Sequence, residues 1–302
     1  MGTIPVKLEE RFLVPVGGGK DSAVTLEILK NASHRRVRRE GGTKKNIQCF
    51  SLNPTKQALK IIQTTGFRKP IIVKRKIDKK LFELNRKGFL NGHTPFSAYL
   101  AFLGSFLALI FDYKFIALSN EKSSNEGNLK YLGKVINHQY SKSFDFEQKF
   151  RNYSKKYLAK NIEYFSFLRP LYEIQIAKLF SQYQKYFSIF LSCNKAYKTN
   201  SGKKKPTGKW CCNCPKCLFV FASLYPFLGE KKVVKIFGQN LFQKKGLLPT
   251  MLELIGERKF KPFECVGTKK ESLVAFYLSW KEANRIGETP FLLKYFEKEI
   301  LP

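Results

Sequence analysis

The sequence predicts an α/β fold with a Rossmann-like, parallel five-stranded sheet, followed by a cysteine-rich element and a helical C-terminal extension. Three observations predict it. Short apolar runs alternate with segments of helical periodicity over the first two thirds of the chain. A glycine-rich turn joins the first apolar run directly to a helix, and helical patterns dominate after residue 219. Strands separated by helices indicate a parallel sheet with both faces covered.

The segment 12–22 (FLVPVGGGKDS) organises the rest of the chain. Phe12–Val16 is short, apolar and β-branched, as expected of a buried strand. The three glycines that follow remove side chains from the turn, so backbone N–H groups can surround an anion. A helix with apolar spacing opens at Ser22, and its free N–H groups and dipole favour phosphate. The spacing matches neither a Walker A loop nor GxGxxG. Pro15 is irregular here, because it removes a ladder donor from a strand expected at the sheet centre.

The remaining elements of the sheet follow in order. We expect strands at Ile47–Leu52, Ile71–Lys76, Phe115–Leu118 and Phe187–Leu191. We expect helices at Thr55–Thr65, Lys79–Arg86, Pro95–Phe111, Phe144–Leu158 and Leu171–Tyr183, and a basic, solvated connection at His34–Lys45. Ligands of such sheets bind beyond the carboxyl ends of the strands. The glycine turn and the segments after Leu52 and Leu118 should therefore meet at one edge.

One apolar segment, Pro95–Phe111, approaches the length of a membrane span. It contains Gly104, falls short of a comfortable span, and runs through Asp112 and Lys114 into another strand-like segment. We therefore expect a helix buried against the sheet and no membrane insertion.

The net charge of +32 makes nucleic acid a possible partner. However, lysine outnumbers arginine 43 to 12, and Phe, Tyr, Ile and Asn are abundant, as an AT-rich coding sequence would produce. The lysines are also spread along the whole chain. A polyanion partner and codon bias both explain the charge, so nucleic acid is possible but not favoured.

Seven cysteines with no secretory signal indicate a reducing, cytoplasmic location and a metal rather than disulfides. Cys211, Cys214 and Cys217 form CxxCxxC, and Cys193 closes the expected fifth strand. Four thiolates suit tetrahedral Zn²⁺, and a complete protein shell makes such a site structural. Cys212 is the spare cysteine, and its register with Cys211 is ambiguous. An iron–sulfur cluster remains an alternative.

The glycine turn resembles the SGGxDS loop of the PP-loop ATP pyrophosphatases (HUP type), with Gly17 where those enzymes usually have Ser. Several longer strings together resemble one family, the UDP-N-acetylmuramoyl-L-alanyl-L-glutamate epimerases. They are PVGGGKDS, FSLNP, NGHTPFSA, LSNEKSSNEGN, NHQYSKSFDFE, SCNKA with WCCNCPKC, and KPFECVG. The resemblance runs from about Phe12 to the C-terminus. Two features depart from the family: its members carry a longer region before the loop, and Cys212 stands where a small residue is expected.

The resemblance implies an ATP- and Mg²⁺-dependent inversion at the terminal glutamate of a UDP-linked muropeptide precursor, with release of AMP and diphosphate. A free carboxylate makes the adjacent Cα–H very weakly acidic. Conversion to an acyl-adenylate removes the negative charge and lets a side-chain base take the proton. Reprotonation on the other face, followed by hydrolysis, gives the D-centre.

The residues that would bind ATP and Mg²⁺ fall into three groups at the expected sheet edge. Diphosphate would be held by Gly17, Gly18, Gly19, Lys20, Asp21 and Ser22, with Lys20 as the charge partner and Asp21 orienting magnesium or capping the helix. Adenine would be recognised by Ser51, Leu52 and Asn53, for which simple turn chemistry is an equal alternative. Magnesium or the substrate would be bound by Asn120, Glu121, Glu126 and Asn128, for which a solvated loop is the alternative.

Inversion requires acid–base groups on both faces of the carbon. The candidates are Cys265, His93 and His138, which all lie in strings that resemble the family. Cys265 is our first choice for proton abstraction, because a modest base suffices once the carboxylate charge is masked, although a free Cys is as often a small buried hydrophobe. His34 lies in the basic connection and is expected to be solvated.

We expect three domains: an α/β core at 8–192, a zinc-binding element at 193–228 and a helical extension at 229–302. Two other functions remain open. A tRNA- or nucleobase-modifying ATP pyrophosphatase would share the loop and the cysteine site and would use the positive charge. A truncated, non-catalytic relative would follow from the short segment before the loop. The oligomeric state is not predicted.

Overall fold

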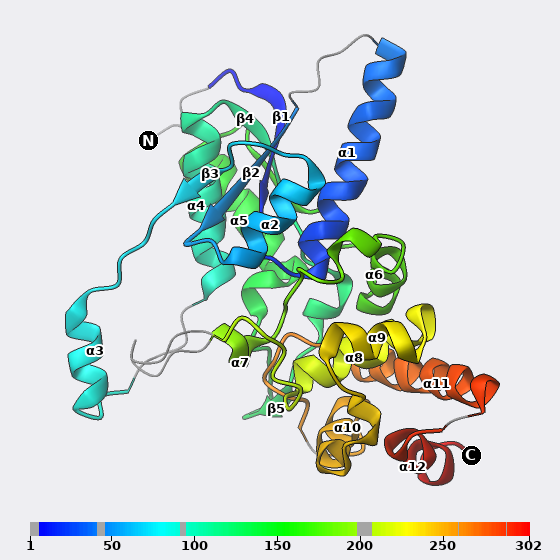
Figure 1. The fold of residues 1–302 in the computed structure, drawn as a ribbon. Helices are drawn as coiled ribbons and strands as arrows, with labels where there is room; N and C mark the ends of the chain where they lie inside the picture. The colour runs from blue at the N-terminus through cyan, green and yellow to red at the C-terminus, as the bar shows by residue number, and fades with distance from the viewer. Residues whose placement is uncertain (1–5, 41–45, 91–94, 198–206, 259, 288) are drawn as a thin grey trace. The chain divides into compact units, whose positions relative to one another are not determined.

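A computed structural model describes residues 6–40, 46–90, 95–197, 207–258, 260–287 and 289–302 (Figure 1). The chain divides into two compact units. The first consists of the described residues up to Asn120, with Tyr140–Arg169, Tyr197 and Thr207. The second consists of Glu121–Gln139, Pro170–Ala196 and the described residues from Gly208 onward.

A five-stranded parallel sheet forms the centre of the first unit and confirms the predicted α/β class. The strand order is β3-β2-β1-β4-β7. Its strands are β1 (Glu9–Pro15), β2 (Ile47–Leu52), β3 (Ile71–Val73), β4 (Tyr113–Leu118) and β7 (Glu163–Ser166). Its helices are α1 (Lys20–Glu40), α2 (Lys56–Thr65), α3 (Lys79–Arg86), α4 (Phe96–Ile110) and α5 (Phe144–Tyr153).

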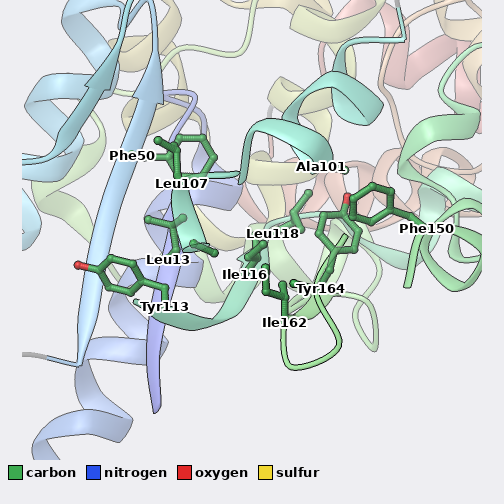
Figure 2. Packing of buried hydrophobic residues seen from close by; sticks show 12 residues of the cluster. Leu13, Phe50, Ala101, Leu107, Tyr113, Ile116, Leu118, Phe150, Ile162 and Tyr164 are labelled. Atoms are coloured by element: carbon green, nitrogen blue, oxygen red, sulfur yellow. The ribbon is translucent and has the colours of Figure 1, made fainter. Parts of the chain in front are cut away.

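Strand register places alternate side chains on two faces of this sheet. Leu13 pairs with Ile116 of β4, which pairs with Tyr164 of β7, so the three side chains share one face. Figure 2 shows them packed with Leu107 of α4 and Phe150 of α5 in a single apolar cluster. This core covers one face of the sheet and leaves the carboxyl ends of the strands aligned along one edge.

Pro15 is accommodated at the last position of β1. The N–H of Phe12 donates to the carbonyl of Asn46, just before β2, at 2.7 Å, and the N–H of Val16 donates to Phe50 of β2 at 2.9 Å. The backbone groups of the odd-numbered positions between them therefore face β4. The pairing of β1 with β4 ends at Leu13. The proline therefore stands beyond the last paired position on that side, and the expected loss of a ladder donor does not arise.

The long apolar helix α4 packs against the sheet as expected, but on one side only. A Cβ atom on Gly104 would lie 3.3 Å from Cγ2 of Ile116, so the glycine allows the helix to approach β4 closely. The opposite side of α4 exposes aromatic and aliphatic side chains, among them Phe102, Phe106 and Ile110. Among the described residues, no helix is long and apolar enough to cross a membrane.

The prediction of Phe187–Leu191 as the fifth strand was wrong. The N–H groups of Ile189 and Phe190 both donate to the carbonyl of Tyr186, in a turn that follows a 3₁₀ segment. Phe190 and Leu191 are buried, and Phe190 packs its ring on Phe180 and Trp210 rather than in a ladder. The fifth strand is the four-residue β7, whose polar first and last residues concealed it.

Other boundaries also differ from the sequence-based expectation. Helix α1 begins at Lys20 and continues to Glu40, so the first part of the expected basic connection is helical. Strand β3 ends at Val73, three residues early, where its carbonyl accepts the N–H of Asn53 at 2.8 Å. The helix expected to run to Leu158 is α5 followed by a π-helical turn, Ser154–Leu158.

The second unit is mainly helical, in agreement with the predicted C-terminal extension. Its elements include the hairpin β5 (Leu129–Tyr131) and β6 (Lys134–Ile136), and helices α6 (Glu173–Phe180), α8 (Pro215–Leu228), α9 (Glu230–Phe237), α10 (Leu248–Ile255), α11 (Lys269–Ile286) and α12 (Phe291–Glu299). The short helix α7 (Asn194–Tyr197) follows Cys193. Compact units need not be separately folding domains, so the three expected domain ranges stay a prediction.

Helix α8 is the core of the second unit. All of its residues from Lys216 to Tyr225 are buried, and α6, α9, α10 and α11 pack around it. A helix that is apolar on all sides is stable only when it is enclosed in this way. Cys214 is its N-cap residue and Cys217 lies in its first turn, so the CxxCxxC motif is anchored in this buried helix.

Candidate functional site

In the first unit, the glycine loop (Gly17–Ser22) joins the end of β1 to the start of α1. Gly18 has φ +93°, and a Cβ atom there would lie 2.9 Å from the backbone N of Ala58 in α2. Only glycine meets both conditions without strain. Gly17 donates its N–H to Oγ of Ser22 at 3.3 Å, which closes the turn. The loop therefore presents its backbone at a helix N-terminus, an arrangement that can bind an anion.

Lys20 and Asp21 place one charge of each sign in this loop. Nζ of Lys20 forms an ion pair with Oδ1 of Asp21, and Lys20 is buried, whereas the Asp21 side chain is 27% exposed. Asp21 also lies in the first turn of α1, where a carboxylate is favoured by the helix dipole. The partly exposed carboxylate is therefore positioned to interact with a cation, and it also pairs with the buried lysine.

At the end of β2, two of the three residues expected to recognise adenine are engaged within the protein. Oγ of Ser51 donates to the carbonyl of Val16 at 2.9 Å and links β2 to the glycine loop. Asn53 has φ +44°, and its amide makes two hydrogen bonds of 2.8 Å with the backbone of Arg75. Leu52, the last residue of β2, is half-buried. Side-chain recognition of adenine by Ser51 would thus require loss of a buried hydrogen bond.

Asn120 lies at the same edge of the sheet, because β4 is parallel to β1 and β7. Its Nδ2 donates to Oγ of Ser166, at the end of β7, at 3.1 Å. Nη2 of Arg169 donates to the same Oγ at 3.1 Å and also lies 3.1 Å from Oε2 of Glu147. Sequence reasoning missed Ser166 and Arg169 because it missed β7; the polar residue that ends this short strand was the available signal.

In the second unit, the four predicted cysteines meet. The Sγ atoms of Cys193, Cys211, Cys214 and Cys217 all lie within 4.8 Å of one another, and those of Cys211 and Cys217 are 3.7 Å apart. Thiolates bound tetrahedrally to one zinc ion at about 2.3 Å lie about 3.8 Å from each other. The donor set and its spacing fit one tetrahedral ion, whereas an iron–sulfur cluster would have to separate the sulfurs to fit between them.

Charge is unevenly distributed over the four thiols. Hydrogen bonds from Cys214 and Cys217 hold the pKa of the Cys193 thiol well below its usual range. The pKa values of the Cys214 and Cys217 thiols are raised, and the main cause is the hydrogen bond that each thiol makes with Cys193. The cluster thus already favours thiolate, the form that binds metal, at Cys193.

Cys212 does not belong to the cluster, which resolves the register of the motif. It has a left-handed φ of +52°, and its thiol is not among the four that lie together. Its Sγ donates to the carbonyl of Phe237 at 3.3 Å, and burial raises the pKa of its thiol.

Lys216, in the first turn of α8, makes hydrogen bonds with the segment Lys261–Val266, which we call the strap. The backbone N–H of Lys216 donates to Oε2 of Glu264 at 3.2 Å, so a strap carboxylate caps α8. Nζ of Lys216 donates to the carbonyl of Cys265 and lies 3.5 Å from Oε1 of Glu173, in a buried ion pair. Lys216 lies between two clustered cysteines in the sequence, so the cysteine cluster and the strap are directly connected.

The strap also contacts the polar segment that precedes and follows the β5–β6 hairpin. Oε1 of Glu126 lies 3.1 Å from Nζ of the buried Lys261 and accepts the N–H of Lys269 at 3.1 Å. Nδ2 of Asn128 donates to the carbonyl of Pro262 at 2.9 Å, and its Oδ1 lies 2.8 Å from Nδ1 of His138. Glu126 and Asn128, expected to bind magnesium or substrate, therefore organise this part of the protein.

The proton-transfer candidates and Glu121 have different settings. His138 and Cys265 are both half-buried in the second unit, and the strap connects their surroundings. His93 lies outside the described residues. Glu121 is buried, and its carbonyl accepts Oγ–H of Ser124 at 2.7 Å.

The Lys216–Glu173 pair was not anticipated, because its two residues are 43 positions apart and neither belongs to a local motif.

Comparison with known proteins agrees with the sequence resemblance. Residues 3–167 match the MurL N-terminal domain, and residues 189–299 match the MurL C-terminal domain. The chain is similar to proteins named UDP-N-acetyl-alpha-D-muramoyl-L-alanyl-L-glutamate epimerase from a Micromonospora species, Salinispora tropica and Xanthomonas oryzae pv. oryzae. Identity is 37%, 36% and 35% over 90%, 90% and 91% of this chain. The chain spans 59%, 57% and 59% of the length of these relatives.

Proposed function

Because the chain belongs to the MurL family, we propose that it is an ATP-dependent epimerase of a peptidoglycan precursor. The proposed reaction inverts the terminal L-glutamate of UDP-N-acetylmuramoyl-L-alanyl-L-glutamate and releases AMP and diphosphate. The observation that carries the proposal is the match of both MurL domains, in order, along the chain. A nucleotide-linked precursor and reduced thiols agree with a reaction in the cytoplasm.

The first unit would activate the glutamate. The glycine loop supports a PP-loop type of diphosphate binding, because it offers backbone N–H groups at the start of α1. Asp21 is the best-placed carboxylate of this loop for Mg²⁺, which prefers oxygen ligands and substrate phosphates. Formation of the acyl-adenylate would remove the charge of the carboxylate and acidify the adjacent Cα–H.

The second unit would invert the activated carbon. Inversion needs one group to remove the proton and another to return it on the opposite face. Cys265 and His138 are the described candidates, and their shared connection to the strap supports a common role. After reprotonation, hydrolysis of the adenylate would release the D-glutamyl product.

The metal would be structural Zn²⁺, held by Cys193, Cys211, Cys214 and Cys217. Four cysteines leave no open coordination position for substrate, and such sites contribute folding energy. The contact of Lys216 with the carbonyl of Cys265 gives the ion a further role, because it would hold the strap through the first turn of α8.

The test is ATP–diphosphate exchange with and without the UDP-linked muropeptide, followed by chiral analysis of the product glutamate. We expect exchange that depends on the muropeptide and a D-glutamyl product. Exchange stimulated by tRNA or a nucleobase instead would favour a nucleic-acid-modifying pyrophosphatase. No exchange with any of these compounds would favour a non-catalytic relative.

A further inference from the structure

We propose that Asn128 is a positioning residue that keeps the hydrogen of neutral His138 on Nδ1, and that Nε2 of His138 thereby accepts the proton from the glutamate Cα. This inference rests on the proposed function, since it assigns one of the two proton-transfer groups that inversion requires. The hydrogen bonds that carry it all lie within the second unit.

The side-chain amide of Asn128 has one orientation that suits its neighbours. Its Nδ2 donates to the carbonyl of Pro262 at 2.9 Å, and its Oδ1 accepts the backbone N–H of His138 at 3.0 Å. A carbonyl only accepts and a peptide N–H only donates. If Oδ1 and Nδ2 of Asn128 were interchanged, an oxygen would face the carbonyl of Pro262 and an NH₂ group would face the N–H of His138, and both hydrogen bonds would be lost. Asn128 is 5% exposed, which makes the loss of both hydrogen bonds costly.

The orientation of this amide determines which imidazole nitrogen carries the hydrogen. Oδ1 of Asn128 also lies 2.8 Å from Nδ1 of His138. Oδ1 has no hydrogen to give, so Nδ1 has to donate, and in a neutral imidazole the other nitrogen then has the free lone pair. Within the described part of the chain, Nε2 of His138 has no hydrogen-bond partner. The half-buried ring therefore holds an acceptor ready for an incoming ligand.

A pocket shares one lining residue, Phe263, with the surroundings of this histidine. The ring of Phe263 meets the imidazole of His138 edge-on, with centroids 6.0 Å apart. Phe263 also lines a pocket of about 470 Å³, together with Leu129, Glu253, Phe260, Lys261 and Pro262. A ligand in this pocket contacts the same ring that flanks His138, and Cys265 follows two residues later on the strap.

The proton balance of the step is complete with groups of this protein and solvent. The lone pair of Nε2 takes the Cα hydrogen of the adenylated glutamate, and the C–H electron pair moves into the acyl carbonyl to give an enolate. The thiol of Cys265 supplies a proton to the other face as the enolate electrons return to Cα. The resulting imidazolium and thiolate exchange protons with water before the next turnover. An amide suits the supporting position, because it orients the ring without adding a charge.

The first test reads the tautomer by ¹⁵N NMR of histidine-labelled protein, with the His138 signals assigned by their loss in His138→Gln. We expect a protonated Nδ1 and a bare Nε2 in the wild type and in Asn128→Asp, which keeps an acceptor. Asn128→Leu removes the acceptor and should shift the hydrogen toward Nε2. The matched control is Asn137→Leu, since Asn137 also makes two backbone hydrogen bonds in this loop but no contact with the imidazole. A wild-type signal with the hydrogen on Nε2 would overturn the inference, whatever the outcome for the proposed function.

The second test separates the half-reactions by measuring ATP–diphosphate exchange and deuterium incorporation at the glutamate Cα in D₂O. In His138→Gln, we expect adenylate formation to persist and incorporation to fall by about 100-fold or more. Asn128→Leu should lose at least about tenfold of the incorporation, as expected of a wrong tautomer, and Asn128→Asp should restore most of it. Wild-type incorporation in His138→Gln would overturn the catalytic assignment. A wild type that forms no adenylate would refute the proposed function instead, and the NMR result would still decide the role of Asn128.

Discussion

The glycine loop of the first unit and the strap of the second are built in different ways. The loop is a backbone structure, in which glycine conformation, a strand end and a helix start lie within a few consecutive residues. The strap is held by side chains from distant parts of the chain: Lys216, Asn128 and Glu126 contact it from 49 or more positions away. The first kind of site tolerates little change in its own residues, whereas the second depends on partners elsewhere.

The largest expected effect tests the side-chain-built region. Cys214→Ser should lose bound zinc and lower the melting temperature by roughly 10 °C or more, because closed zinc sites contribute directly to folding. Cys212→Ser is the matched control, and elemental analysis should find its metal content unchanged. Equal zinc content in both variants would contradict the assignment of the four ligands.

The next effect tests the backbone-built region by its chemistry. Asp21→Ala and Ser22→Ala should each lower ATP–diphosphate exchange by about 100-fold or more while the protein stays folded, since in the proposed reaction the loop would act on phosphate and not on the core. Asp78→Ala removes a carboxylate from the N-cap of α3 and serves as a control for the loss of such a group. Undiminished exchange in the Asp21 and Ser22 variants would refute the loop as the nucleotide site.

A smaller effect separates two neighbouring glycines of the loop. Gly18→Ala should lower the free energy of unfolding by about 1–3 kcal/mol, because φ is positive and the new Cβ would meet the backbone of α2. Gly17→Ala has no atom within 4 Å of its Cβ and should change stability by less than about 0.5 kcal/mol. Chemical denaturation of both variants measures the difference, and equal losses would mean that the loop is less closely packed on α2 than described.

The smallest effect concerns the pKa of Cys49, a buried thiol of the first unit that lies outside the cysteine cluster of the second unit. Burial raises the pKa of Cys49 to about 12, from a value of 9.0 for an unperturbed thiol. The folded state holds this proton more tightly than the unfolded state does. The contribution of Cys49 to the free energy of unfolding is therefore fully present below pH 9 and is lost as the pH rises toward 12. At pH 10 the loss is about 1.4 kcal/mol. Cys49→Ala should therefore flatten the decline in unfolding free energy between pH 8 and 10, and parallel curves would show that Cys49 ionises normally.

The two regions also differ in how well the sequence predicted them. The glycine loop and the clustering of the four cysteines were predicted because residue type and spacing within short segments indicate such sites directly. β7 was not predicted, since a four-residue strand with polar ends carries little periodic signal, while the aromatic run Phe187–Leu191 imitates a strand without pairing. The strap contacts could not be predicted, because nothing local indicates that Asn128 will meet Pro262, 134 residues later.

The position of Lys216 between two clustered cysteines has a consequence for the use of ATP. If the proposed reaction divides as described, loss of zinc releases the strap in the second unit but leaves the glycine loop of the first unit intact. The protein would then continue to form the adenylate without inverting its carbon, and hydrolysis would return the unchanged L-glutamyl precursor. Each such cycle converts ATP to AMP and diphosphate with no product. In the proposed reaction, zinc supply would thus determine whether nucleotide consumption and cell-wall precursor synthesis remain coupled.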